Sequence, residues 1–132
     1  MPMKSLVVAC VLAAAGAASA QDQVVNLYSA RHYATDEALY SGFTKATGIK
    51  INRVDSDDAG IMARLKAEGA ASPADVILLV DAARLYRGEA DGLFLPVRSK
   101  VLEDAIPANL RATPVADGGI PWFGLSTRAR VV

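Results

Sequence analysis

The sequence has little cysteine, little histidine and no excess of charge. Cys10 is the one cysteine among 132 residues, so an internal disulfide is excluded. His32 is the one histidine, so a zinc site built from three imidazoles is excluded as well. Fourteen basic residues balance fourteen acidic ones, which argues against a strongly basic nucleic-acid-binding protein. The sequence also lacks a nucleophile elbow, a phosphate loop and a His-Glu-x-x-His motif.

The longest apolar run lies at the very start of the chain. A basic residue, Lys4, precedes an apolar segment, and a small-x-small triplet ends at Ala20. These three parts are typical of a secretory signal peptide, and the apolar run is short for a membrane-spanning helix. We therefore expect residues 1–20 to be a signal peptide and residues 21–132 to work outside the cytoplasm. The alternative is a retained membrane anchor.

After residue 20, short strand-like runs alternate with longer helical patterns. This alternation predicts an α/β domain with a mostly parallel sheet, flanking helices and right-handed crossovers. The continuous apolar run at 75–80 is typical of a strand buried on both faces of such a sheet. Strands are expected at 24–28, 49–54 and 75–80, and helices at 35–47, 58–68 and 82–90, with a β-prone run at 122–132. Thr35 is expected to cap the first of these helices, and Asp36 and Glu37 are the acids of its first turn.

In open parallel sheets, ligands bind beyond the carboxyl ends of the strands. Three segments follow the predicted strands, at 29–33, at 55–58 and at residue 81. The first carries an imidazole and a phenol side by side, His32 and Tyr33. A phenolate is a hard anionic donor suited to a highly charged cation such as Fe(III), and imidazole is a good nitrogen ligand. The alternative is an exposed His-Tyr pair that binds no metal.

An acidic cluster, residues 55–58, follows the second predicted strand. Its spacing resembles the start of a calcium-binding loop, but the twelfth position, which requires glutamate, is Lys66. We expect Asp57 or Asp58 to cap the following helix instead.

Other polar and aromatic residues allow two interpretations. Asp81 follows the third predicted strand and would either orient a ligand side chain or cap the next helix. Arg128 and Arg130 share one face of a predicted strand, where they would hold an anion or form an ordinary polar face. Three tyrosines in or beside apolar periodic segments are expected to pack rather than to bind a ligand: Tyr28, Tyr40 and Tyr86.

Seven segments of the chain carry a family resemblance: 28–33, 35–36, 43–44, 47–49, 72–76, 80–85 and 124–131. Taken together and in order, they resemble the ferric-iron-binding periplasmic substrate-binding proteins of ABC importers, in their tyrosine-rich branch. The similarity covers nearly all of residues 24–132. It implies the first lobe of a two-lobed, type II periplasmic-binding-protein fold that closes on Fe(III) and delivers it to an inner-membrane permease.

The resemblance also implies roles for individual residues. In that family the first lobe supplies a histidine and, in the tyrosine-rich branch, the tyrosine after it, which are His32 and Tyr33 here. Another branch has a glutamate ligand where this chain has Val80. Residues expected beside the ligands or on a synergistic anion are Arg31, Asp81, Arg128 and Arg130.

The resemblance further implies that adjacent tyrosines of a second lobe complete the iron shell, so residues 21–132 are expected to be part of a longer, monomeric protein. Its partners would be Fe(III) and an ABC permease, with no nucleic acid and no catalysis. Two alternatives remain. One is a binding protein for a small organic anion held by Arg31, Arg128 or Arg130. The other is a secreted metal-dependent hydrolase that uses His32 with the acidic cluster 55–58.

Overall fold

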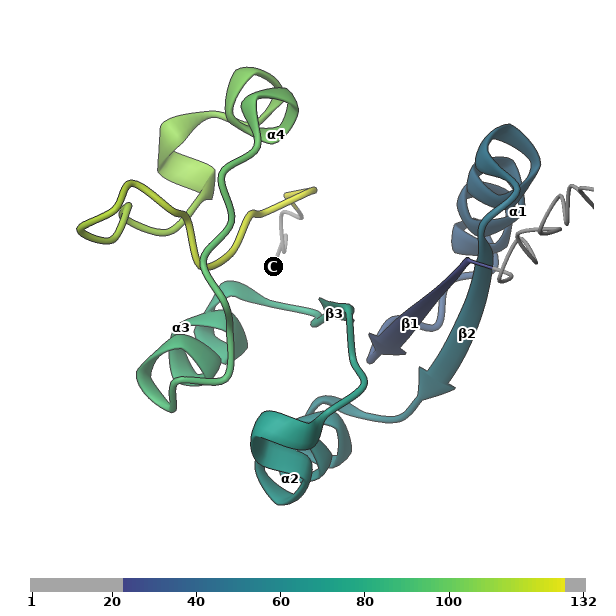
Figure 1. Cartoon of the computed structure of the whole chain (residues 1–132), viewed down its shortest axis with the longest axis horizontal. Coiled ribbons are helices and arrows are strands. Elements are labelled where there is room, and N and C mark those ends of the chain that lie inside the picture. The colour runs from purple at the N-terminus through teal and green to yellow at the C-terminus, as the bar shows by residue number, and fades with distance from the viewer. Residues whose placement is uncertain (1–22, 128–132) are drawn as a thin grey trace, which may run out of the picture.

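The computed structural model describes residues 23–127, and it confirms the predicted alternation of strands and helices. The predicted signal peptide at 1–20 and the arginines at 128 and 130 lie outside the described residues. Figure 1 shows the arrangement of the elements. They are β1 (Val24–Ser29), α1 (Asp36–Thr47), β2 (Lys50–Asp55), α2 (Asp58–Glu68), β3 (Val76–Leu78), α3 (Ala82–Ala90) and α4 (Lys100–Ala105), with single 3-10 turns at Gly69–Ala71 and Ala108–Leu110.

The three strands form one parallel sheet in the order β2-β1-β3. The register places Tyr28 of the central strand opposite Val54 and Ile77. Because side chains directly opposite one another in a parallel sheet lie on the same face, these three residues form one apolar strip. All three strands therefore end at the same edge of the sheet, which is the edge where the sequence predicts a ligand site.

Helix α2 covers this apolar strip. Ile61 and Leu65 are buried and pack in one core cluster with Tyr28, and Val54 and Ile77 pack against that cluster. The inward face predicted from the spacing of Ile61, Met62 and Leu65 is confirmed, because all three are buried. Burying a side chain of this size stabilises the fold by about 1.5–3 kcal/mol relative to exposing it. Helix α2 thus holds the sheet from one side.

The buried phenol of Tyr28 is held by polar groups at the end of α2. Its hydroxyl donates to Glu68 at 2.8 Å, and Arg64 Nε donates to Tyr28 Oη at 3.2 Å. Ser72 donates to the same glutamate at 2.6 Å. Tyr28 is therefore a packing residue, as predicted, with a satisfied hydroxyl.

Two local predictions are wrong. The strand expected at 75–80 is only three residues long and lies at the edge of the described sheet, so Val76 is 42% exposed rather than buried on both faces. The apolar composition indicated a strand but did not specify its place in the sheet. Thr35 was expected to cap α1, yet its backbone is helical and its side chain makes no capping hydrogen bond. The other end of α1 follows the prediction, since Gly48 has the left-handed φ of 75° that favours glycine.

A second apolar cluster lies beyond α3. Buried Ala112, Ile120 and Trp122 form it, and Leu85 of α3 packs against it. Trp122 donates its indole N–H to Glu89 at 2.7 Å, and the ring of Tyr86 meets it edge-on at 5.0 Å. Tyr86 is 62% exposed, so the prediction that it packs is met only by this edge-on contact.

The stretch after Pro121 has less strand structure than its composition predicts. Within 122–127 the backbone forms no named strand, and Phe123 makes a single antiparallel bridge to Arg111. Among residues 23–127 no helix is both long enough and apolar enough to cross a membrane.

Candidate functional site

Three loops leave the carboxyl edge of the sheet, and the central one carries His32 and Tyr33. Backbone hydrogen bonds hold the bases of the loops together. Ala30 donates to the carbonyl of Leu78 at 2.8 Å, and Ser56 donates to the carbonyl of Ser29 at 3.1 Å. His32 and Tyr33 follow directly, and both are exposed, Tyr33 by 48%. The structure thus places the predicted pair at the predicted edge, with both side chains accessible to a solute.

Ser29 fixes the start of this central loop. The residue is fully buried at the end of β1. Its hydroxyl accepts a hydrogen bond from the Arg31 amide at 3.1 Å and donates one to the Arg31 carbonyl at 3.2 Å. A side chain that satisfies backbone groups two residues ahead forms a local turn. The turn directs the chain out of the sheet just before His32.

Arg31 and Asp36 join the two ends of the loop. Arg31 Nε and Nη2 donate to the two carboxylate oxygens of Asp36 at 3.0 and 3.1 Å, so the ion pair is bidentate. The hydrogen bond from Arg31 holds the pKa of Asp36 below its ordinary value, and the same bond raises the pKa of Arg31, although partial burial opposes both shifts. The guanidinium carbon lies 5.0 Å from the centre of the Tyr33 ring. Tyr33 also accepts a hydrogen bond at its carbonyl from the Asp36 amide, at 3.0 Å, where α1 begins.

The acidic cluster after β2 is used to support the fold. Asp57 caps α2 by accepting a hydrogen bond from the Gly60 amide at 2.7 Å, so the predicted capping role is confirmed. Asp58 accepts from the Val80 amide at 3.3 Å and thereby joins the second loop to the third. Asp55 pairs with Arg53 at 2.8 Å. Between residues 23 and 127, no three His, Cys, Asp or Glu side chains gather into a group that could hold a metal, so the hydrolase alternative has no three-ligand site there.

Asp81 caps the helix that follows the third loop. Its carboxylate accepts a hydrogen bond from the Arg84 amide at 2.9 Å, at the first turn of α3. Of the two interpretations left open by the sequence, the geometry supports the cap. The residue lies at the same sheet edge as the central loop but points its carboxylate at its own helix.

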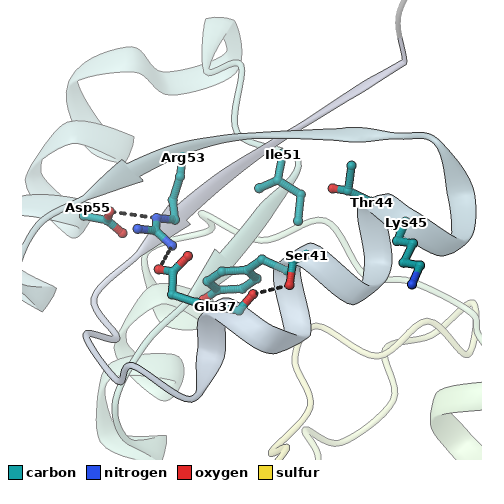
Figure 2. A pocket seen from close by; sticks show the side chains of 8 residues that line it. Glu37, Ser41, Thr44, Lys45, Ile51, Arg53 and Asp55 are labelled. Carbon is teal, nitrogen blue, oxygen red and sulfur yellow. Dashed lines mark hydrogen bonds and ion pairs between the residues drawn. The ribbon is translucent and has the colours of Figure 1, made fainter.

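A separate cavity of about 720 Å³ lies between α1 and β2 (Figure 2). At the wall of this cavity, Glu37 and Asp55 both pair with Arg53. Neither His32 nor Tyr33 lines the cavity. The Tyr40 hydroxyl beside it is buried and lacks a hydrogen-bond partner among the described side chains. The prediction that Tyr40 packs is thus met only for its ring. The guanidinium carbon of Arg53 lies 5.3 Å from the centre of that ring.

The sequence interpretation missed two residues of the central loop, Ser29 and Asp36. Ser29 was assigned to the loop only by its position, and Asp36 only to the first turn of a helix. The residue types alone did not reveal either role, because the burial of Ser29 and the loop path that brings Asp36 to Arg31 are properties of the fold.

Searches of known proteins find relatives that handle iron, although no family model matches this chain. Iron uptake protein A1 of Synechocystis sp. is 51% identical over 112 residues, which cover 85% of this chain and 30% of that protein. The Fe(3+)-binding periplasmic protein of Serratia marcescens is 32% identical over 130 residues, which cover 98% of this chain and 37% of that protein.

A solved structure of an iron-bound protein is also similar to this chain. The Trichodesmium protein solved in complex with iron and citrate matches with a TM-score of 0.68 and 48% identity, over 76% of this chain and 30% of that one. The chain therefore spans about 30% of the length of the most similar proteins described here. Its sequence, its parallel α/β sheet and this structural match agree that the chain belongs to the family of ferric-iron-binding periplasmic proteins.

Proposed function

We propose that this chain is the first lobe of a two-lobed periplasmic protein that binds Fe(III) and delivers it to an inner-membrane ABC permease. The observation that carries the proposal is the accessible His32–Tyr33 pair at the carboxyl edge of the sheet, in a chain 51% identical to an iron uptake protein. The share of the relatives that the chain spans supports a larger protein around this unit.

His32 and Tyr33 contribute part of the iron shell in this proposal. The Tyr33 phenol loses its proton to the Lewis acidity of Fe(III) and binds as phenolate, while the His32 imidazole binds through a ring nitrogen. Both side chains are exposed on a loop whose base is fixed by the sheet, so an ion can reach them without unfolding of the sheet.

Two donors do not hold Fe(III) tightly, so the second lobe supplies the remaining ligands. Adjacent tyrosines of that lobe complete the shell when the lobes close about their hinge. Closure buries the ion and creates the shape that the permease recognises, and the protein works as a monomer. Acid favours release, because protons compete with iron for phenolate and imidazole. Residues 1–20 direct export and are removed.

A synergistic anion belongs to the same proposal. The Trichodesmium relative was solved with citrate as well as iron. In this chain Nε and Nη2 of Arg31 are already engaged by Asp36, so that edge of the guanidinium is not open to an anion. We assign an anion to Arg128 and Arg130 instead. In the alternative of an organic-anion carrier, the engaged Arg31 likewise leaves Arg128 and Arg130 as donors to the anion.

The test is a titration of the full-length gene product with Fe(III), followed by the phenolate-to-iron absorption band. The wild-type protein is expected to develop the band with one equivalent of iron, and Tyr33→Phe to lose part of its intensity and bind iron more weakly. Tyr86→Phe is the matched control, since it removes the hydroxyl of another exposed tyrosine, one that packs against Trp122. Equal bands in the two variants would reject Tyr33 as a ligand, and no band in the wild type would reject the function.

A further inference from the structure

Arg31 is held at its backbone and at one edge of its guanidinium. Ser29 fixes the backbone amide and carbonyl, and Asp36 takes Nε and Nη2 in a bidentate pair. Asp36 is itself only 9% exposed. A planar guanidinium that makes two hydrogen bonds along one edge has little rotational freedom. Its plane is therefore set by the fold rather than by solvent.

The guanidinium of Arg31 also lies over the ring of Tyr33. Its central carbon is 5.0 Å from the centre of the Tyr33 ring, within the range of a cation–π contact. Arg31 and Tyr33 flank His32 in the sequence, so the contact spans the histidine. The ring thus rests on a group whose position Ser29 and Asp36 determine.

We propose that Arg31 is a positioning residue for Tyr33: the guanidinium held by Asp36 orients the tyrosine ring, so that the phenol oxygen is presented to the incoming ion before binding. This inference rests on the proposed function, and it replaces the anion-binding role considered for Arg31 from sequence. A ligand that is oriented in advance loses less conformational freedom on binding, which strengthens the complex.

The chain contains a matched control for this arrangement. Arg53 also lies over a tyrosine ring, that of Tyr40 at 5.3 Å, and also pairs with carboxylates, those of Asp55 and Glu37. Its side chain is 32% exposed, close to the 27% of Arg31. Arg53→Gln therefore removes the same kind of contact away from the His-Tyr pair.

The experiment is a double-mutant cycle between Arg31→Gln and Tyr33→Phe in the full-length protein, read by iron affinity and by the phenolate-to-iron band. Arg31→Gln is expected to weaken iron binding about two- to fivefold, the range of a cation–π contact at an exposed site. It should also move the band to longer wavelength, because a nearby positive charge stabilises the phenolate electrons that the transition transfers. In the Tyr33→Phe background the same substitution should change neither quantity, and Arg53→Gln should change neither in the wild type.

Each other outcome decides against the inference. A band unchanged by Arg31→Gln, or a change that persists without the Tyr33 hydroxyl, overturns the positioning role while leaving iron binding intact. Absence of the band in the wild type overturns the proposed function itself. If Arg31→Gln alone fails to fold because Asp36 loses its partner, Arg31→Gln with Asp36→Asn removes both charges of the pair, and the same cycle applies.

Discussion

Removal of the Ser29 hydroxyl tests how the central loop is held. Ser29 is fully buried, and its hydroxyl makes two hydrogen bonds to the backbone of Arg31. In Ser29→Ala both bonds are lost, and the Arg31 amide loses the partner that it has in the wild type. The substitution removes one oxygen atom and leaves almost no cavity, so packing contributes little to the expected change.

The magnitude follows from the two bonds. Each intramolecular hydrogen bond contributes about 0.5–1.5 kcal/mol net, so the free energy of unfolding should fall by about 1–3 kcal/mol. Ser41→Ala is the control, because the Ser41 hydroxyl also bonds to backbone, the Glu37 carbonyl at 2.8 Å, but lies exposed on α1. A surface substitution of this kind should stay within about 0.5 kcal/mol of the wild type.

Urea unfolding with an unchanged m-value measures the loss of stability, and hydrogen exchange of the Arg31 amide measures the local effect. Exchange at that amide should accelerate in Ser29→Ala and stay the same in Ser41→Ala. If the two variants show equal stability and equal exchange, Ser29 does not hold the loop and the reasoning is refuted.

Three further substitutions test other parts of the structure. Gly88→Ala should cost about 1–3 kcal/mol of unfolding free energy, because the added Cβ would lie 2.3 Å from Phe94 Cζ, and a stability equal to wild type would contradict that crowding. Gly42 lies in α1, and no neighbouring atom outside the helix backbone comes within 4 Å of an added Cβ there. Gly42→Ala should therefore raise the free energy of unfolding by about 0.5–1 kcal/mol, and a lower value in urea unfolding would show that the added carbon is crowded. Hydrogen bonds from Ser72, Tyr28 and Arg64 hold the pKa of Glu68 in the folded protein below the ordinary 4.5. The ionised Glu68 carboxylate therefore stabilises the fold above that pH, and this contribution is lost as the pH falls through the pKa of the folded protein. The stability difference between wild type and Glu68→Gln should therefore shrink in acid, and a constant difference between about pH 7 and about pH 3 would argue against the shift.

The helices were predictable where their ends are encoded locally. Asp57 and Gly69 bound α2 at the predicted residues, because a capping carboxylate and a glycine act on the backbone next to them. The place of β3 in the sheet was not predictable, since strand order depends on contacts between segments far apart in the sequence. Thr35 failed as a cap because the turn from Tyr33 to Asp36 already makes its backbone helical.

The candidate site was predictable in position but not in its supporting contacts. The rule that ligands lie beyond the carboxyl ends of parallel strands found His32 and Tyr33. Nothing in the residue types reveals that Arg31 pairs with Asp36 and faces the Tyr33 ring, since both contacts depend on the path of the loop. The sequence therefore indicates which donors are present, and the fold shows what orients them.

The proposed iron site is tested most directly by locating the iron in crystals of the iron-loaded full-length protein, by anomalous scattering at the iron edge. The proposed site predicts one strong peak at bonding distance from a His32 ring nitrogen and the Tyr33 hydroxyl oxygen. A peak at the cavity between α1 and β2, or at the acidic cluster after β2, with His32 and Tyr33 away from the metal, would contradict it.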